Sequence, residues 1–337
     1  MPIPSMSDRL PRRALGGATV LLLLFLSACG STAADDADSE GWSHISGSGK
    51  TIKTDHTPKR IIAQADAAAA LMAYGIKPVG IFGNEKPEEN KNLKGMDLKG
   101  VAVLGTTWGE IDVEKAATLK PDLIVSDYWP AEKTYGGIEK GTKKESRKIA
   151  ELAPFIGGAQ GESIVTLLEY YEGLAKSLGA DVETSDGARD KAAFDAAVKD
   201  FKAATAEKKG LTAAAVSPAD DLLYVAVPEH APELLDFKRW GLDVITPRDP
   251  DKKFPYWENL SWENADKYQP DVLLVDDRAF ANAQKVVKKQ PSWKSIKAAE
   301  ADAVIAWPAY WVHTYARYAE QLERMAGEIR KADPDLT

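Results

Sequence analysis

Short apolar runs alternate with segments of helical periodicity along most of the chain. The apolar runs fall into two series, 60–63, 79–82, 101–104 and 123–126 in the first half and 222–227, 244–245, 272–275 and 304–306 in the second. The residues between them favour helices, beginning with an alanine-rich segment at 67–74 that stops at Gly75. This alternation is typical of an α/β fold with a largely parallel sheet.

A strongly helical stretch separates the two series of strands. Residues 163–178 predict one helix and residues 184–208 predict a second, longer one, with Phe194, Ala197 and Phe201 recurring at helical spacing. An amphipathic helix is expected at 314–331 near the end of the chain. Roughly 280 residues follow the N-terminal segment, enough for two lobes of about 100–150 residues each.

An internal repeat supports two similar lobes. Residues 108–125 match residues 257–274 without a gap at tryptophan, glutamate, alanine, proline and aspartate. In each copy a polar residue, Asp112 or Ser261, can cap a helix, and a glutamate, Glu114 or Glu263, stands in the first turn, where the helix dipole favours negative charge. A Pro-Asp pair then ends the helix and precedes a buried strand. Such a device is common in α/β proteins, but the matching tryptophan six residues before each glutamate favours duplication.

The N-terminus predicts a targeting segment. Arg9, Arg12 and Arg13 precede an apolar run at 14–26, which is shorter than the ~20 residues of a spanning helix. The last residue of the run begins the tetrapeptide Leu-Ser-Ala-Cys29, which resembles the lipobox of bacterial lipoproteins. The resemblance implies cleavage before Cys29 and lipid on its sulfur. The alternative is an ordinary secretory signal with an incidental cysteine.

The residues around this signal complete the expected N-terminal organisation. Residues 1–28 are expected to be the signal peptide and residues 29–55 a flexible tether and entry segment, since the first part is small and acidic. Cys29 is the only cysteine, so an internal disulfide is excluded. Two acyl chains would hold a soluble domain firmly at a membrane surface.

Charge and motif content exclude several functions. The formal net charge of −8 and the lack of a basic cluster argue against nucleic acid as a partner. The sequence Ser-Gly-Ser-Gly-Lys-Thr at 46–51 looks like the end of a phosphate-binding loop. However, His44 stands where the first glycine is needed and no buried strand precedes it, so we expect an ordinary loop. The four histidines, at 44, 56, 230 and 313, lack metal-ligand spacing, so no resident metal or cofactor is expected.

At the repeated unit and the long helical stretch, the chain is similar to the siderophore- and cobalamin-binding proteins of ABC importers. The similarity runs from 57 to the terminal helix and implies the class III periplasmic-binding-protein fold. In that fold two Rossmann-like lobes, here 56–181 and 209–337, are joined by a single long rigid α-helix, here 182–208. It also implies that Glu114 and Glu263 dock onto arginines of the permease, as fixed carboxylates suit bidentate arginine. The alternative is that both only compensate helix dipoles.

The resemblance places the ligand in a cleft between the lobes, on loops at the carboxyl ends of strands. These loops are rich in aromatic residues, which give large contact area at small entropic cost. Core packing is the alternative for each ring. Arg278 is the best-placed cation for the iron-ligating oxygens, unless it only pairs with a neighbouring aspartate. His313 could line the cleft or act as a structural donor. The expected aromatic ligand contacts are Trp108, Tyr128, Trp129, Tyr256, Trp257, Tyr310 and Trp311.

One arginine among many rings favours a neutral or weakly charged ferric hydroxamate over a triply negative ferric catecholate, with iron arriving already chelated. Cobalamin and haem remain open. The expected partners are this ferric siderophore, an ABC importer permease, its ATPase indirectly, and the membrane through the lipid, with the protein a monomer. A rival from another class is an exported carboxylate-dependent hydrolase, but Glu114 and Glu263 stand on separate lobes. A purely structural lipoprotein would leave the aromatic loops unexplained.

Overall fold

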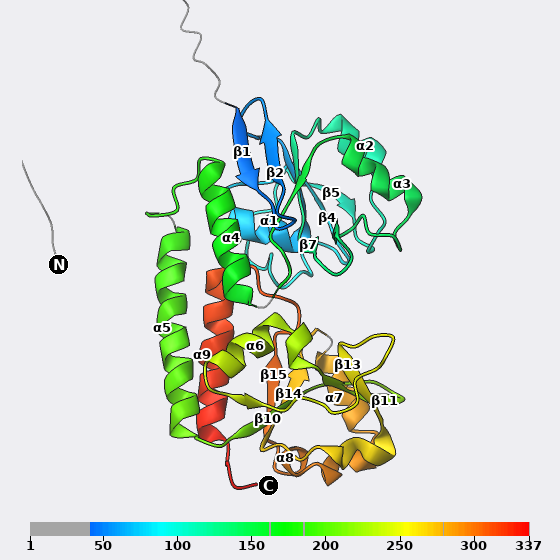
Figure 1. Ribbon diagram of the computed structural model, residues 1–337, viewed down its shortest axis with the longest axis vertical. Helices are drawn as coiled ribbons and strands as arrows, with labels where there is room; N and C mark the ends of the chain where they lie inside the picture. The colour runs from blue at the N-terminus through cyan, green and yellow to red at the C-terminus, as the bar shows by residue number, and fades with distance from the viewer. Residues whose placement is uncertain (1–40, 162, 185, 279, 337) are drawn as a thin grey trace, which may run out of the picture. The chain divides into compact units, whose positions relative to one another are not determined.

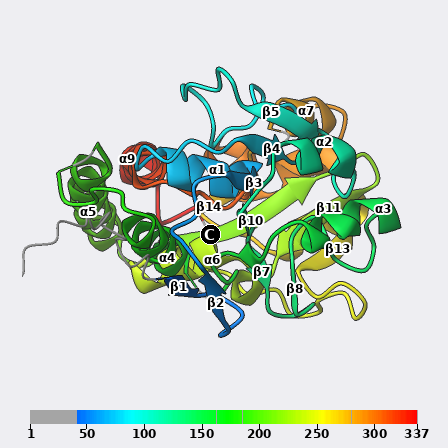
Figure 2. The same ribbon diagram turned by 90° about the horizontal axis from the view of Figure 1, so that it is seen from above.

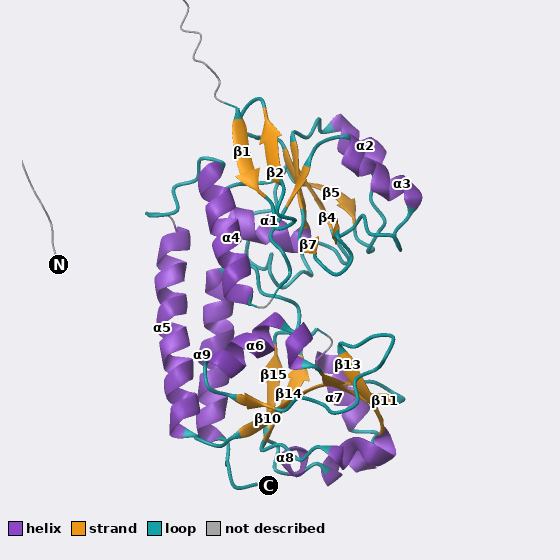
Figure 3. Ribbon diagram, viewed as in Figure 1, coloured by secondary structure: helices purple, strands orange, loops and turns teal. Residues whose placement is uncertain are grey.

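The computed structural model describes residues 41–161, 163–184, 186–278 and 280–336. The expected signal peptide and Cys29 lie outside the described residues. Residues 40–337 cluster as one unit, and two α/β lobes can be followed within it (Figures 1 and 3).

The first lobe is built on a parallel sheet. Within residues 41–161 this sheet has five strands in the order β5-β4-β3-β6-β9. Helices or loops cover both faces of this sheet, so side chains on both faces of a strand are buried. The strands therefore coincide with the continuous apolar runs of the sequence. The strands are β3 (Ile61–Gln64), β4 (Gly80–Phe82), β5 (Ala102–Gly105), β6 (Leu123–Val125) and β9 (Phe155–Ile156), and the helices are α1 (Ala65–Met72), α2 (Val113–Thr118), α3 (Lys144–Arg147), η1 (Lys148–Glu151) and α4 (Ile164–Ser177).

Two small hairpins extend the first lobe. The strands β7 (Tyr128–Trp129) and β8 (Thr134–Tyr135) pair antiparallel at the carboxyl end of β6. The strands β1 (Trp42–Ile45) and β2 (Thr51–Thr54) also pair, with Gly49 in the left-handed region at their turn. Residues 46–50 are the loop of this hairpin, so a loop is present as expected, but the two strands that it joins lie in the segment expected to be a tether and entry segment. Trp42 is buried and donates to the carbonyl of Ser177, which ties this hairpin to α4.

The second lobe has a mixed sheet. Within residues 186–278 and 280–336 it has six strands, in the order β13-β11-β10-β14-β15 with β12 beside β10. β12, β14 and β15 run parallel to their neighbours, whereas β11 and β13 are antiparallel. The strands are β10 (Thr212–Pro218), β11 (Leu222–Ala226), β12 (Asp243–Val244), β13 (Trp257–Ser261), β14 (Val272–Asp276) and β15 (Val304–Trp307). The helices are η2 (Pro228–His230), α6 (Pro232–Arg239), η3 (Trp262–Lys267), α7 (Phe280–Val287), η4 (Pro291–Ser295), α8 (Lys297–Glu300) and α9 (Tyr315–Lys331).

A long helix leads from the first lobe into the second. α5 (Asp186–Glu207) has 22 residues, which corresponds to about 33 Å. Its buried face, including Phe194 and Phe201, packs against α9 and the core of the second lobe, where Phe194 stacks on Tyr318 at 5.4 Å. In Figure 2, α4, α5 and α9 gather on one side of the sheets. α4 also spans the lobes, since Ile164 belongs to the second core and Leu174 to the first.

The two copies of the repeated unit have the same structure around the Pro-Asp pair and the strand after it, but their preceding segments differ. Asp122, before β6, accepts hydrogen bonds from the backbone of β3's start, at Lys59 N and Arg60 N, both at 2.9 Å. Asp271, before β14, accepts from Thr212 N at 2.7 Å and from Thr212 Oγ1 at 2.8 Å. Each aspartate thus fastens equivalent central strands together.

The helix that precedes these strands is regular only in the first copy. Asp112 caps α2 by accepting from Lys115 N at 2.9 Å, as expected. The expected α-helical first turn at Glu263 is wrong, because that segment is the 3-10 helix η3 and Ser261 makes no cap bond to its backbone. The Ser261 hydroxyl instead accepts from the Asn264 amide at 3.0 Å.

Candidate functional site

Two of the expected ligand-contacting tryptophans lie face to face in the first lobe. Trp108, on the loop after β5, stacks on Trp129 of β7 with ring centroids 5.6 Å apart and an interplanar angle of 8°. Trp108 Nε1 donates to Glu139 Oε1 at 2.5 Å, and Glu139 Oε2 accepts from Gly137 N at 2.8 Å. Trp129 Nε1 is buried without a hydrogen-bond partner among the described residues. Both tryptophans are partly exposed.

Tyr128 is placed by the N-terminal hairpin. Its ring meets Tyr135 edge to face at 5.3 Å. The Tyr135 hydroxyl lies 2.7 Å from Ser46 Oγ and 3.3 Å from Ser48 Oγ, so the β1–β2 turn supports the β7–β8 hairpin. Gly47 makes this close approach possible, because a Cβ there would lie 2.2 Å from Ala159 N.

A second aromatic group lies in the other lobe. Trp257, at the start of β13, packs 6.2 Å from Trp307 of β15 and 6.2 Å from Tyr224 of β11. The Arg278 guanidinium lies over the Trp257 ring at 6.0 Å, an arrangement in which the cation is attracted by the ring face. Tyr256 is exposed and contacts the rings of Phe254 and His230 instead.

The Arg278 charge is already paired. Its Nε lies 3.0 Å from both carboxylate oxygens of Asp276, and its Nη2 lies 2.5 Å from Oδ2. The expected alternative role for Arg278, a salt bridge to a neighbouring aspartate, therefore describes what its guanidinium does. Half of the side chain remains exposed, at 51%. The face around Trp257 consequently carries little net positive charge.

Tyr310 and Trp311 lie where the two lobes meet. Lys91 of the first lobe lies over the Tyr310 ring at 5.1 Å and pairs with Asp277 of the second lobe at 3.1 Å. The Trp311 carbonyl accepts from Asn92 Nδ2 at 3.3 Å and lies 2.6 Å from His313 Nδ1.

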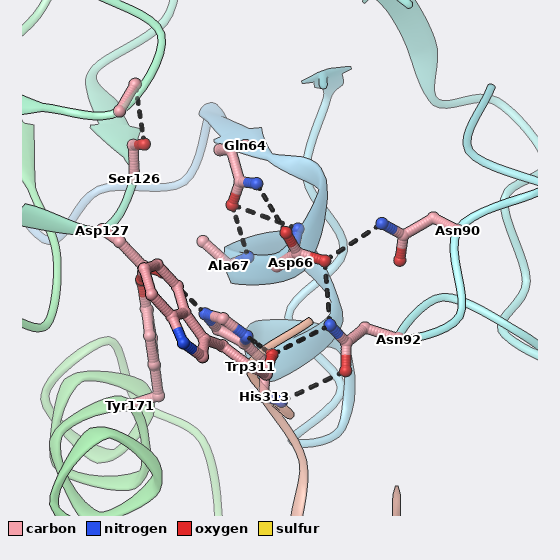
Figure 4. Close-up of polar contacts among 11 residues, drawn as sticks. Gln64, Asp66, Ala67, Asn90, Asn92, Ser126, Asp127, Tyr171, Trp311 and His313 are labelled. Atoms are coloured by element: carbon pink, nitrogen blue, oxygen red, sulfur yellow. Dashed lines mark hydrogen bonds and ion pairs between the residues drawn. The ribbon is translucent and has the colours of Figure 1, made fainter. Parts of the chain in front are cut away.

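Figure 4 shows a buried polar cluster behind Trp311. His313 is 2% exposed, so it does not line a ligand surface and acts as a structural donor. Its Nε2 lies 2.9 Å from Asp127 Oδ2, and Asp127 Oδ1 accepts from the Tyr171 hydroxyl at 2.5 Å. Burial lowers the pKa of His313, but the Asp127 carboxylate outweighs burial and raises it to about 9.

The two proposed docking glutamates are both exposed, one on each lobe. Glu114 lies on α2 and Glu263 in η3. Hydrogen bonds from its own backbone amide and from the Ser261 hydroxyl lower the pKa of Glu263, so its carboxylate is ionised at neutral pH. A groove of about 470 Å³ lies in the same region and is lined by Asp249, Glu258, Asn259, Leu260, Ser261, Asn264, Asp266 and Lys267.

Neither a metal cluster nor a spanning helix is found in the described part of the chain. Among those residues, no three histidine, cysteine, aspartate or glutamate side chains come together as metal ligands. No helix there combines the length and apolar character needed to cross a membrane.

Sequence reasoning anticipated a neighbouring aspartate as the partner of Arg278 but missed the other polar partners of the site. Glu139, Asp276, Asn92 and Asp127 each hold an expected site residue or its loop in place. Asp127 and Asp276 had a visible signal, because each lies at the carboxyl end of an apolar run that predicted a buried strand. Glu139 and Asn92 lie in irregular segments and had none.

Comparison with known proteins identifies relatives that cover most of the chain. A family model described as periplasmic binding protein matches residues 62–311. The Fe(3+)-citrate-binding protein YfmC of Bacillus subtilis is 27% identical over 294 residues, covering 83% of this chain and 84% of YfmC. The crystal structure of DesE, a ferric-siderophore receptor protein from Streptomyces coelicolor, is similar with a TM-score of 0.77 and 31% identity, covering 87% of this chain and 99% of DesE. FhuD2 of Staphylococcus aureus with bound ferrioxamine B shares the fold, with a TM-score of 0.57 and 19% identity over 81% of this chain and 98% of that chain.

Proposed function

The chain belongs to the periplasmic binding protein family, and we propose that it captures a ferric siderophore outside the cytoplasm and delivers it to the permease of an ABC importer. The observation that carries the siderophore assignment is the likeness to DesE, which extends over 87% of this chain. Because the family consists of binding proteins, the chain is a binding protein rather than an exported hydrolase. Iron is its cargo and arrives within the chelate.

The charges near the aromatic groups support a ferric hydroxamate. Arg278 is paired with Asp276, and Lys91 is paired with Asp277. Glu139 adds a carboxylate beside Trp108. A triply negative catecholate would meet few uncompensated cations there, whereas a neutral hydroxamate can bury its apolar linkers against the indoles. Ferric citrate, suggested by YfmC, would need cationic partners for its carboxylates and is the second candidate.

Tryptophan fluorescence titration tests the ligand class. The mature protein is titrated with ferrioxamine B, a ferric tris-catecholate, ferric citrate, cobalamin and haem. We expect tight quenching by ferrioxamine B, because Trp108 and Trp129 would lie against the chelate. Tight quenching by the catecholate, by ferric citrate or by cobalamin alone would refute the hydroxamate preference.

A matched pair of variants locates the quenching. Trp129→Phe should remove much of it, because Trp129 is half of the stacked pair. Trp293→Phe is the control, because Trp293 is 7% exposed in the core on the other side of the second lobe's sheet, beside Trp262. Equal loss of quenching in both variants would contradict the assignment of the site to this face.

Delivery is proposed to depend on Glu114 and Glu263. Both are exposed carboxylates, one per lobe, and the acidic groove at η3 adds further negative charge for a basic permease surface. The double variant Glu114→Ala with Glu263→Ala should abolish uptake of radiolabelled iron while leaving ferrioxamine B affinity unchanged. Glu151→Ala with Glu300→Ala, an exposed glutamate from each lobe, is the control and should transport normally. Loss of ligand affinity in the first double variant would contradict this division of roles.

Membrane attachment through lipid on Cys29 completes the proposal. It is supported by the lipobox-like Leu-Ser-Ala-Cys29 that follows the apolar segment. The protein is proposed to act as a monomer.

A further inference from the structure

The backbone of Trp311 is held in an unfavourable conformation. Its φ is +52°, in the left-handed region that a residue with a Cβ rarely adopts. Trp311 is partly exposed and packs against the core of the second lobe, next to Tyr310. A bulky residue remains in such a conformation only where surrounding contacts fix it. The contacts around Trp311 are therefore informative.

Asn92 of the first lobe holds the loop at residues 311–313 through two hydrogen bonds. Its Nδ2 donates to the Trp311 carbonyl at 3.3 Å, and its Oδ1 accepts from His313 N at 3.1 Å. Asn92 is itself fully buried, and its Nδ2 also donates to Asp66 Oδ1 at 2.8 Å. Asp66 lies in the first turn of α1 and accepts a further bond from Asn90 at 3.0 Å.

His313, which belongs to this loop, also holds it in place through its ring nitrogens. Its two ring nitrogens lie beside the Trp311 carbonyl, at 2.6 Å, and Asp127 Oδ2, at 2.9 Å. A carbonyl oxygen can only accept, so Nδ1 must carry a proton, and a second proton on Nε2 completes an imidazolium–carboxylate pair. Both side chains are buried, where such a charge-assisted bond is stronger than in water and costly to break.

These contacts cross between the lobes. Asn92, Asp66 and Asp127 come from the first lobe, and the 311–313 loop comes from the second; Asp127 and His313 are 186 positions apart in the sequence. In Figure 4 the loop carrying Trp311 and His313 lies between Asp127 on one side and Asn92 on the other.

We propose that His313, Asp127, Asn92 and Asp66 form an interlobe latch that sets the position of Trp311 and thereby the affinity for the ferric chelate. The proposed effect of the latch on chelate affinity rests on the proposed function. The four residues act as positioning residues, and Asn92, Asp127 and His313 are buried. A pre-formed Trp311 loop spares the chelate the cost of ordering it on binding.

A double-mutant cycle tests the link to binding. Ferrioxamine B affinity is measured by calorimetry for wild type, His313→Gln, Trp311→Ala and the double variant. His313→Gln should weaken binding at least tenfold, and Trp311→Ala by a similar factor. In the Trp311→Ala background, His313→Gln should cost less than twofold, because the latch acts through Trp311. Independent, multiplying losses, or unchanged affinity in His313→Gln, would overturn the latch.

A ligand-free readout separates the latch from the proposed function. The protein is labelled with 5-fluorotryptophan, and the ¹⁹F line of Trp311 is identified by its loss in Trp311→Phe. His313→Gln should shift or broaden that line and leave the Trp293 line unchanged. An unchanged Trp311 line would overturn the latch. If the wild-type protein bound no ferric chelate, the proposed function would fail, and the ¹⁹F line would still decide the latch.

A milder variant covers the case in which His313→Gln does not fold. Asn92→Ser keeps a small polar side chain but shortens it, so both bonds to the 311–313 loop are lost. It should reproduce the ¹⁹F change and the tenfold weaker binding. Normal binding and a normal Trp311 line in Asn92→Ser would overturn the proposal.

Discussion

The charge on His313 should make the stability of the protein depend on pH above neutrality. Burial lowers the pKa of this imidazole, but Asp127 and then Asp66 and the Trp311 carbonyl outweigh it and raise the pKa to about 9. An unfolded histidine titrates near 6.5. Because the folded pKa is the higher one, the stabilisation is complete below pH 6.5 and is lost as pH rises through 9. The difference corresponds to about 3 kcal/mol of unfolding free energy.

A second buried group titrates in an overlapping range. Glu233 in α6 is 1% exposed, and neither carboxylate oxygen has a partner among the described residues. Burial raises its pKa to about 8, against 4.5 when unfolded. The folded state therefore holds a proton that the unfolded state releases, and stability falls as pH rises from 4.5 to 8, by about 5 kcal/mol in all. Of these two groups, only Glu233 acts between pH 4.5 and 6.5, and only His313 acts between pH 8 and 9.

Urea unfolding from pH 5 to 9.5 separates the two groups. The variants are His313→Gln and Glu233→Gln, compared with wild type at each pH. The stability difference between wild type and His313→Gln should shrink by about 3 kcal/mol between pH 6.5 and 9, with a slope of at most about 1.4 kcal/mol per pH unit. Glu233→Gln should reduce the decline below pH 6.5 and keep the one between pH 8 and 9.

The comparison of variants makes the result specific. His44, whose pKa burial lowers, and the exposed His56 titrate in both proteins and cancel in the difference. The groups that face His313 are Asp127, Tyr171 from α4 and Asp66 from α1, besides the Trp311 carbonyl. If the wild-type and His313→Gln curves ran parallel from pH 6.5 to 9, His313 would not carry a charge in the folded protein, and the reasoning would be refuted.

Four further outcomes can be measured directly. Trp129→Ala should weaken ferrioxamine B binding by about 1–3 kcal/mol in calorimetry, as for an aromatic residue that supplies much of the contact; unchanged affinity would remove it from the site. Gly47→Ala should lower stability by about 1–3 kcal/mol in urea unfolding, because its Cβ would lie 2.2 Å from Ala159 N; unchanged stability would show that the turn can shift. Cys29→Ala should move the protein from the membrane fraction to the soluble fraction in immunoblots, and retention in the membrane would refute lipid anchoring. Ligand binding should change the radius of gyration little in X-ray scattering, since α5 and the latch join the lobes, and a large decrease would contradict this.

Much of the fold was predictable because it depends on short-range patterns. The Pro-Asp pair before each central strand is visible in the sequence, and Asp122 and Asp271 make equivalent bonds. The strand β10 was missed because its residues, beginning Thr212-Ala-Ala-Ala, are small and do not stand out as an apolar run. The strand β13 was missed because the repeat suggested that its residues mirror the loop after Trp108. The two copies share residues there but differ in structure. Trp108 lies on a loop, whereas Trp257 begins an edge strand that pairs with β11.

The site could be predicted by residue type but not by pairing. Aromatic side chains after buried strands can be read from the chain, and Trp108 and Trp129 do come together. Whether Arg278 is available to a ligand depends on the rotamers that it and Asp276 adopt, which the sequence does not fix. His313 and Asp127 are 186 residues apart, so their contact follows only from the way the two lobes close on each other.

The distribution of charge in this structure favours selection by shape. Arg278 and Lys91, two cations beside the proposed ligand contacts, are each paired with an aspartate of the second lobe, so they attract a distant anion only weakly. The ion pair of His313 with Asp127, in which both side chains are buried, joins the two lobes. Under the proposed function, we expect discrimination among ferric chelates to come from the indole surfaces and their fixed spacing. Aromatic side chains select a ligand by the area of contact that its shape allows. They discriminate well only if the loops that carry them are already fixed before the ligand binds.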